Sequence, residues 1–473
     1  MGGILLVPGL ALPGLLGIVV LLALRSTRHP LTAPGEFTWI AGAGYLTGAF
    51  LLTLWMRALS LVGIKFSLLA VGGPLLVATI LLGLWVLRRD AAAQADTAPL
   101  LPSLRRALRA PDLAPMARAV WWLLLGWLVL RFALLGVEVI TRPLYPWDAW
   151  IQWATKARVW YELGTIVPFA RINEWLAANG AAWFDASPEY PPTMPLLQVW
   201  SCLLLGRWDD ALMNGAWWQI AVALTLAVYG GLRSLGIATL AALVGAFLVA
   251  SLPLANVHVA LAGYADLPLA AWYTAAAFAF LRWNQHRNWR DAALIVFLLV
   301  ACTQIKNPGY FWALTLAPAL VAVLLPRHGV RVAFAGFAAA IILMVVLAQF
   351  RLSVFNYQLK LDFEPAWGEL AQSYFLLGNW HLLWFGVLAA GALAWRQLLS
   401  PALAPVTLVV GAGLLFLFFV FAFTNASAFI ADQTTVNRAT LHLAPLMVVF
   451  IVLAWDEFAQ RWHAVHAPPR AAA

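Results

Sequence analysis

Charged residues are scarce in this chain: only 10% of its 473 residues are Asp, Glu, Lys or Arg, whereas 63% are hydrophobic. No long segment of mixed polarity is present, which argues against a large soluble domain. The mean hydropathy of +0.84 and repeated apolar runs of roughly 17–25 residues instead predict an all-α, polytopic transmembrane protein. Because charge at membrane depth is costly unless it is paired or hydrated, each charge in an apolar segment becomes a functional candidate.

Cysteine is almost absent, and its two copies, Cys202 and Cys302, lie in apolar segments. This usage argues against a disulfide framework and a cysteine metal site. No Walker loop, zinc-ligand spacing, Gly-x-Ser-x-Gly or dinucleotide fingerprint occurs in a fitting context. The sequence therefore predicts no cofactor, while it leaves a divalent metal open. The net charge of +9 comes mostly from Arg in short loops, which indicates contact with anionic membrane lipids and not with nucleic acid.

The apolar runs predict about 13 membrane spans. They are 4–24, 37–59, 66–87, 117–140, 211–232, 236–256, 266–283, 291–304, 309–325, 330–349, 381–397, 402–424 and 440–455. Arginines follow alternate spans, as the preference for basic residues in cytoplasmic loops requires. The arginines are Arg25, Arg28, Arg88, Arg89, Arg105, Arg106, Arg109, Arg282, Arg287, Arg290, Arg327, Arg331, Arg396 and Arg461. We expect a cytoplasmic (inner) membrane protein with its N-terminus outside and its C-terminus in the cytoplasm.

One apolar segment, 193–206, is shorter than a full transmembrane helix, and we interpret it as an incomplete or tilted segment. If it crossed fully, Asp266 and Lys306 would move to the side opposite Asp148. With 193–206 as an incomplete segment, the outer side carries two long loops, 141–192 and 350–380. Long loops in compact proteins usually carry function.

The chain divides by pattern into three parts. Residues 1–116 hold three N-terminal spans and a cytoplasmic linker, which covers 88–118 and is rich in Ala and Pro. Residues 117–456 form the main membrane module, and 457–473 form a cytoplasmic tail.

The first outer loop opens with Tyr145-Pro146-Trp147-Asp148-Ala149-Trp150. Asp148 lies at a predicted helix start, where the helix dipole favours a carboxylate. Residues 148–162 predict an amphipathic interfacial helix with Asp148, Gln152 and Lys156 at every fourth position of one face. Two interpretations stay open: a helix cap with a snorkelling lysine, or a catalytic carboxylate with a ligand-binding lysine.

Two further outer segments carry acidic or aromatic residues. Glu189-Tyr190-Pro191-Pro192 precedes segment 193–206 and is either a rigid turn or a substrate-binding element. Asp266 precedes an apolar run and is either an N-terminal cap or a second catalytic carboxylate. Because its own loop has no other carboxylate, any partner must come from another outer loop, and Asp148 is the leading candidate.

All four lysines of the chain fall on the predicted outer side: Lys65, Lys156, Lys306 and Lys360. This placement opposes the cytoplasmic preference of basic residues, and an anionic ligand such as a phosphate is the simplest reason for it. Lys306 lies in Lys306-Asn307-Pro308-Gly309, a break between two apolar runs. Arg438, in Thr434-Thr435-Val436-Asn437-Arg438, offers a planar fork for phosphate oxygens or anchors a helix end among head groups. His442 is interpreted as a helix contact.

The order of these motifs resembles the GT-C superfamily of integral-membrane glycosyltransferases. The nearest resemblance is to its bacterial branch of protein mannosyltransferases and the lipid A aminoarabinose transferase. It covers about residues 117–456 and rests on Asp148, the amphipathic helix, Tyr190-Pro191-Pro192, Asp266-Leu267-Pro268-Leu269, Lys306-Asn307-Pro308-Gly309 and Arg438. Two features depart from the family: the three extra N-terminal spans, and Pro308 where Glu is commoner.

The resemblance implies a polyprenyl-phosphate-sugar donor, a glycan, lipid or protein acceptor, and an inverting transfer at the extracytoplasmic face. It implies that Asp148 and Asp266 are catalytic and that Lys156, Tyr190, Lys306, Asn307 and Arg438 bind substrate. Two other functions stay open: a polysaccharide polymerase or ligase that uses lipid-linked sugars, and a transporter. The former enzymes usually place their large outer loop late in the chain, and a transporter needs charge along a path through the membrane.

Overall fold

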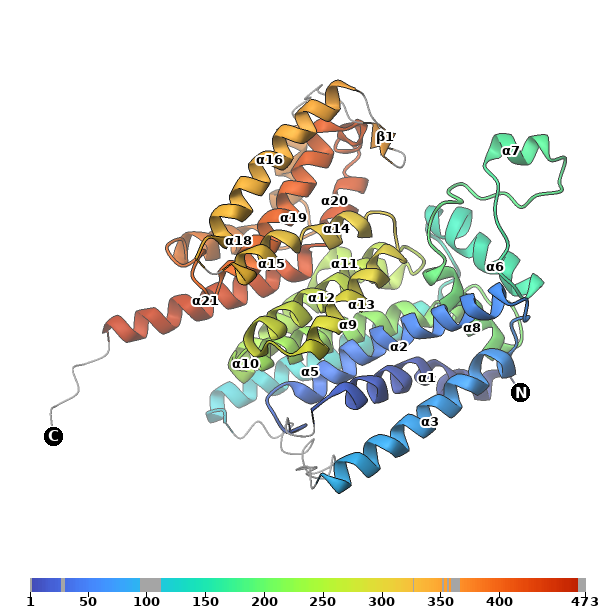
Figure 1. The fold of residues 1–473 in the computed structure, drawn as a ribbon, viewed down its shortest axis with the longest axis horizontal. Coiled ribbons are helices and arrows are strands. Elements are labelled where there is room, and N and C mark those ends of the chain that lie inside the picture. Colours follow the sequence, from blue (N-terminus) through green and yellow to red (C-terminus); the bar gives the residue numbers. More distant parts are fainter. Residues whose placement is uncertain are drawn as a thin grey trace. The chain divides into compact units, whose positions relative to one another are not determined.

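A computed structural model describes residues 2–26, 30–93, 112–325, 327–350, 353–354, 357–358 and 366–466. Arg28, Arg105, Arg106, Arg109, Lys360 and parts of the segments 88–118 and 350–380 lie outside these ranges. The described chain is almost entirely helical (Figure 1). Its one pair of strands, β1 (Ser353–Val354) and β2 (Tyr357–Gln358), is antiparallel, with Ser353 opposite Gln358. The predicted all-α class is confirmed.

Within the described residues, seven helices are long and apolar enough to cross a membrane, or up to nine if each of two bent pairs is one span. The seven lie in α1 (Gly2–Leu24), α2 (Glu36–Leu61), α3 (Leu68–Ala92), α5 (Pro115–Thr141), α9 (Gly215–Ser234) with the turn η2 (Leu212–Asn214) before it, α16 (Gly329–Gln349) and α19 (Ala404–Phe423). The bent pairs are α10 (Thr239–Ser251) with α11 (Pro253–Ala260), at 58°, and α20 (Thr434–Leu441) with α21 (Ala444–His466), at 53°. These helices are compatible with a multi-pass membrane protein.

Four predicted spans form helices that do not meet this test, so the number 13 is not confirmed. α13 (Trp289–Thr303) has 15 residues and α18 (Leu383–Leu393) has 11, which is short for a hydrocarbon core of about 30 Å. The predicted span 309–325 is two pieces, α14 (Gly309–Leu314) and α15 (Ala317–Leu324). α12 (Asp266–His286) is long enough but carries more polar residues, and it buries every residue from Asp266 to Arg282. It is a core helix of its unit.

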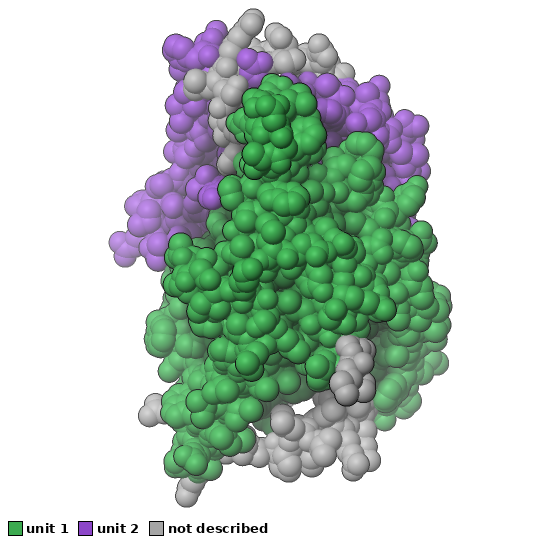
Figure 2. Space-filling view, turned by 90° about the vertical axis from the view of Figure 1, so that its right-hand side faces the viewer, with its two compact units in different colours: residues 1–251, 255–283, 287–309 green, residues 252–254, 284–286, 310–473 purple. Residues whose placement is uncertain are grey.

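The chain forms two compact units, which Figure 2 shows in different colours. Unit 1 comprises Met1–Ser251, Ala255–Trp283 and Arg287–Gly309, and unit 2 comprises Leu252–Leu254, Asn284–His286 and Tyr310–Ala473. Unit 1 also holds η1 (Ala149–Trp153), α6 (Ala154–Leu163), α7 (Ile172–Ala177) and α8 (Thr193–Leu205). Unit 2 also holds α17 (Trp367–Ala371), η3 (Gln372–Leu376) and η4 (Asn425–Phe429). The three N-terminal helices thus belong to the same unit as the helices up to α13.

Small residues bring the N-terminal helices close to their neighbours. A Cβ atom on Gly17 of α1 would collide with the carbonyl oxygen of Gly44 in α2, and one on Gly48 would collide with that of Pro13. On another face of α2, a Cβ on Gly42 would meet the carbonyl oxygen of Ala223 in α9. Such contacts let backbones approach closely, which is how membrane helices gain packing energy. Pro13 lies beside Gly48 and the later Gly17 lies beside the earlier Gly44, so α1 and α2 run antiparallel.

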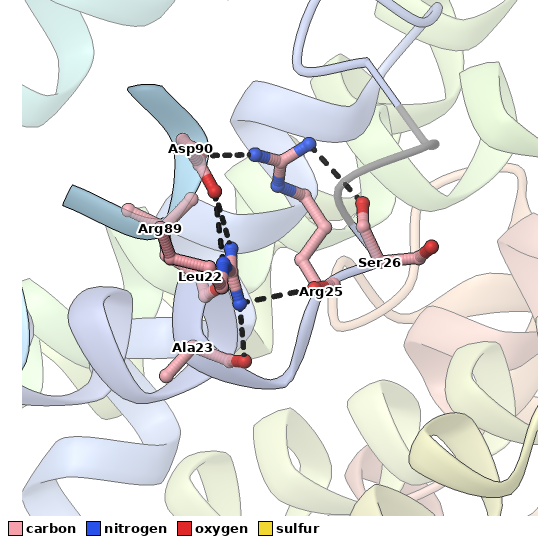
Figure 3. A network of polar contacts seen from close by, with 6 residues as sticks. All are labelled: Leu22, Ala23, Arg25, Ser26, Arg89 and Asp90. Carbon is pink, nitrogen blue, oxygen red and sulfur yellow. Dashed lines mark hydrogen bonds and ion pairs between the residues drawn. The ribbon is translucent and has the colours of Figure 1, made fainter. Parts of the chain in front are cut away.

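Arginines paired with carboxylates lie at one end of unit 1, which we call the arginine end. Figure 3 shows Arg25 and Arg89 pointing toward Asp90, with Arg25 Nη2 2.6 Å and Arg89 Nη2 2.7 Å from its oxygens. Arg282 in α12 lies 2.9 Å from Glu36 at the start of α2. Because each cation has a carboxylate partner, these charges lie in a helical bundle without an uncompensated charge.

Candidate functional site

A buried lysine–aspartate pair lies at the opposite end of unit 1, which we call the lysine end. Since Arg282 near the end of α12 lies at the arginine end, the first residue of α12, Asp266, lies at the other. Lys306 Nζ is 2.5 Å from Asp266 Oδ1, and Asp266 is fully buried. Lys306 sits in the turn after α13, where its N–H is 3.4 Å from the Cys302 carbonyl and its own carbonyl accepts from Gly309. The structure therefore brings two predicted site residues into direct contact.

The Lys306–Asp266 ion pair is a strong polar contact, and replacing either residue is expected to lower the stability of the fold. A charge-assisted bond between an ammonium and a carboxylate is among the stronger polar contacts in proteins. Asp266 is the first residue of α12, where the helix dipole interacts favourably with a carboxylate. Removing one member of a buried ion pair typically costs about 3–5 kcal/mol.

Asp148 lies in a loop that touches the loop before Asp266. Gly263 has φ of +122°, and a Cβ there would collide with Cβ of Ala149, the residue that follows Asp148. Only glycine adopts this conformation readily, so both the backbone angle and the close contact require it. Trp217 Nε1 donates to the Tyr264 carbonyl oxygen at 2.7 Å and holds the same loop. Two predicted catalytic carboxylates thus come from adjoining loops, and Asp148 is half-buried.

The helix after Asp148 differs from the predicted one. Residues 149–153 form the π-helical turn η1, and α6 follows it. The wider turn changes the phase of the side chains relative to a regular α-helix. Gln152 and Lys156, expected on the polar face of the helix, are buried. These two side chains therefore point into the protein, while the interfacial position of the helix stays a prediction.

Lys156 is buried because loop 164–192 supplies acceptors for it. Its Nζ lies 2.7 Å from the Ser187 carbonyl oxygen and 3.3 Å from that of Tyr190. It lies 3.5 Å from Asp185 Oδ1. An ammonium group has three donors, and these three acceptors match them. We interpret Lys156 as a residue that holds loop 164–192, while its predicted role in substrate binding stays a prediction.

Asp185 is a buried carboxylate that the sequence interpretation did not single out. Burial raises the pKa of Asp185, and the positive charge of Lys156 opposes that rise. Burial likewise lowers the pKa of Lys156, and Asp185 opposes that change. Asp185 Oδ1 accepts from the Ser187 N–H at 2.8 Å, whereas Oδ2 is buried without a hydrogen-bond partner in the described part of the chain. Its place in an aromatic-rich segment of the long first loop was the only sequence clue.

Arg57 of α2 is a second missed residue, and it joins two of the predicted motifs. Arg57 Nη2 donates to Thr193 Oγ1 at 2.5 Å, and Nη1 donates to Gln304 Oε1 at 2.7 Å. Thr193 directly follows Tyr190-Pro191-Pro192, and Gln304 lies two residues before Lys306. An arginine inside a predicted membrane span is itself a functional clue.

Tyr190 and Asn307 lie beside the two lysines. The Tyr190 ring packs edge-on against Trp153, with centroids 5.2 Å apart, and its carbonyl oxygen faces Lys156. Asn307 is buried next to Lys306. These contacts place both residues at the lysine end, and their predicted contacts with substrate stay predictions.

Arg438 belongs to unit 2 and is described with that unit. It is half-buried in α20. The neighbouring Asn437 accepts hydrogen bonds from Ser373 and from Trp380, each at 2.9 Å. His442 Nδ1 accepts from Trp312 Nε1 at 2.9 Å, which agrees with the interpretation of His442 as a helix contact.

Unit 2 also holds an apolar pocket of about 190 Å³. Aromatic rings form much of its lining, and Tyr374 stacks on Trp384 with centroids 4.2 Å apart. The Tyr374 hydroxyl is within 2.9 Å of Thr440 Oγ1, so its polar atom is already engaged. The pocket suits an apolar group better than a sugar.

Within the ranges that the structure describes, no three His, Cys, Asp or Glu side chains are grouped to hold a metal ion. No family model, no curated protein and no solved structure matches the chain. The functional argument therefore rests on the motifs and on the geometry of the lysine end.

Proposed function

We propose that this protein is a membrane glycosyltransferase that moves a sugar from a polyprenyl-phosphate donor to an acceptor hydroxyl. One observation carries the proposal: the buried Lys306–Asp266 pair and the half-buried Asp148 lie on adjoining loops at one end of an apolar helical unit. This arrangement supplies a base and a cation in one place, which glycosyl transfer from a phosphate requires. The order of motifs resembling the GT-C superfamily supports the same reaction.

In the proposed reaction, Asp148 acts as the general base. It keeps partial exposure, so an acceptor hydroxyl can approach its carboxylate and transfer a proton to it. The acceptor oxygen forms a bond to the anomeric carbon as the bond from that carbon to the phosphate oxygen breaks. The acceptor proton goes to Asp148, and the electron pair leaves with the phosphate. A single displacement of this kind inverts the anomeric centre.

Lys306 stabilises the phosphate as it departs with negative charge. Asp266 contacts the Lys306 ammonium and fixes its direction, so we assign Asp266 a positioning role in place of a second base. The chemistry needs one catalytic carboxylate, because a phosphate leaves without a protonated acid to assist it.

The reaction is proposed at the extracytoplasmic face of the cytoplasmic membrane. The arginines at the other end of unit 1 support this orientation, because basic residues favour the cytoplasmic side. The acceptor is a glycan, lipid or protein with an accessible hydroxyl, and membrane lipids surround the helices.

A transporter is the second candidate, and one observation favours it. Buried lysine–carboxylate pairs in membrane helices also occur where ions or protons cross, and Lys306–Asp266 is such a pair.

The experiment that separates the two uses membranes with the protein, with Asp148→Asn and with neither. They are incubated with labelled polyprenyl-phosphate sugars, and products are separated by thin-layer chromatography. Transfer of label only with the unaltered protein supports the glycosyltransferase. No transfer from any donor, together with accumulation of labelled solute in proteoliposomes, would favour the transporter.

A further inference from the structure

Arg57 carries a charge that the described residues do not neutralise. Both of its bonded acceptors are neutral, Gln304 Oε1 and Thr193 Oγ1. Its Nε is buried and has no hydrogen-bond partner in the described ranges. A guanidinium has five N–H donors, so three of them have no acceptor within that part of the chain.

The buried arginines at the arginine end are different. Arg25 lies 2.6 Å from Asp90, and Arg282 lies 2.9 Å from Glu36. A buried cation without a carboxylate is costly, and unit 1 avoids that cost at both of these arginines. Arg57 is half-buried and donates only to neutral acceptors, so a bound anion would supply the charge that neutralises it.

We propose that Arg57 is an anion-binding residue of the lysine end, where its planar fork binds two oxygens of a prenyl phosphate. Arg57 contacts Gln304, two residues before Lys306, so the two cations flank one short turn. Arginine is suited to bidentate phosphate contacts. This inference rests on the proposed function, and it gives the N-terminal helices, which lie outside the GT-C-like segment, a part in donor recognition.

The test measures binding of farnesyl phosphate to the purified full-length protein in detergent, with farnesol as the uncharged control. The main variants are Arg57→Gln and Arg57→Lys. Arg131→Gln is the matched control, because Arg131 also lies on a membrane helix, α5, and donates to neutral acceptors, Ala250 O at 3.1 Å and Asn256 Oδ1 at 2.8 Å. Neither acceptor belongs to the lysine end.

We expect Arg57→Gln to raise the Kd for farnesyl phosphate by about tenfold to a hundredfold, as for a lost charged contact. Arg57→Lys keeps the charge but not the fork, so its Kd should rise by about threefold to tenfold. Arg131→Gln should bind farnesyl phosphate as the unaltered protein does, and farnesol should not distinguish any of the variants. If Arg57→Gln does not purify in a folded state, unchanged affinity in Arg57→Lys alone overturns the bidentate contact.

Two more variants separate anion binding from simple tethering. Thr193→Val and Gln304→Ala each remove a neutral contact and keep the charge of Arg57. If both weaken farnesyl phosphate binding as much as Arg57→Gln does, Arg57 is only a tether and the inference is wrong.

The failure of this inference is distinct from the failure of the proposed function. Full affinity in Arg57→Gln, together with lost affinity in Lys306→Gln, removes Arg57 and leaves the glycosyltransferase proposal intact. No binding of farnesyl phosphate by the unaltered protein overturns both.

Discussion

Unit 1 buries two lysine–aspartate pairs, and they are built differently. Lys306 lies 2.5 Å from Asp266 in a direct contact. Lys156 lies 3.5 Å from Asp185 and makes its closest bond, 2.7 Å, to the carbonyl oxygen of Ser187. Both lysines and both carboxylates are buried, so burial and charge alone do not separate the pairs.

The surroundings of each pair separate them. The three acceptors around Lys156 all come from one loop and match its three donors, so this lysine fixes the loop against α6. The Lys306–Asp266 pair instead joins the turn after α13 to the start of α12, next to the loop of Asp148. A buried lysine is therefore a better functional candidate when its partner adjoins a second, accessible carboxylate than when loop carbonyls surround it.

The largest expected effect concerns the membrane side on which both pairs lie. Cysteines introduced at Ala181 and Ala92, both exposed, should react differently with an impermeant thiol reagent in intact cells. Ala181→Cys should be labelled and Ala92→Cys should not, because the preference of basic residues for the cytoplasm predicts that loop 141–192 is outside and 88–118 is inside. The native Cys202 and Cys302 are buried, so the background should be low. The reverse labelling would contradict the outer-face mechanism.

The second-largest effect is expected when the direct Lys306–Asp266 contact is removed. Lys306→Gln should lower stability by about 3–5 kcal/mol, since the buried Asp266 loses the ammonium that it contacts, and should reduce transfer by about a hundredfold or more. Lys306→Gln combined with Asp266→Asn removes both charges and should recover most of the stability, but not transfer. Thermal unfolding in detergent and the labelled-donor assay measure the two effects. Transfer near the unaltered level in the double variant would make the pair purely structural.

The second pair should behave in the opposite way. Asp185→Asn should change stability by less than about 1 kcal/mol, because burial already disfavours the charged carboxylate and Asn keeps an oxygen for the Lys156 and Ser187 donors. The double variant Asp185→Asn with Lys156→Met should likewise stay folded and keep transfer within about threefold, since replacing both members of a buried ion pair is often neutral. If this double variant loses transfer as completely as the Lys306 double variant, the distinction between the pairs is wrong, and Lys156 binds substrate after all.

The smallest expected effect is a pH dependence of stability, which tests whether the folded chain favours the protonated form of Asp185. Burial raises its pKa above the ordinary 3.8, so the folded chain binds this proton at a higher pH than the unfolded chain. Stability from this group should therefore increase as pH falls through the raised pKa, with the gain complete below 3.8. The unfolding midpoint of the unaltered protein, relative to Asp185→Asn, should rise by about 1–3 °C between pH 7 and pH 4. A relative fall would mean that Lys156 stabilises the ionised carboxylate.

The sequence predicted the helices well, whereas the number of 13 spans stays a prediction. A helix occurs at every predicted span, because apolar runs in lipid must satisfy their backbone internally. The helices α12, α13 and α18 fall short of the length or the apolar composition of a standard span. Hydropathy alone does not distinguish a core helix or a short helix from one that crosses the bilayer.

The candidate site was predictable only in part. Asp148 and Asp266 were expected on one side, and Gly263 indeed brings their loops into contact. The partners of Arg57 depend on how α2, α8 and the end of α13 pack, and the partner of Lys156 depends on the path of a long loop. Neither follows from residue spacing, and the π-helical turn η1 changed the side-chain phase that the spacing assumed.

The most direct test of the account is the transfer activity of Asp148→Asn, measured with excess donor. Asp209→Asn is the matched control, because Asp209 accepts from the backbone N–H groups of Ala211 and Leu212 before η2, and Asn caps about as well as Asp. The account predicts a loss of about a hundredfold or more for Asp148→Asn, with normal expression and unfolding temperature, and near-normal transfer for Asp209→Asn. Near-normal transfer by Asp148→Asn would contradict the account and leave Asp266 as the base.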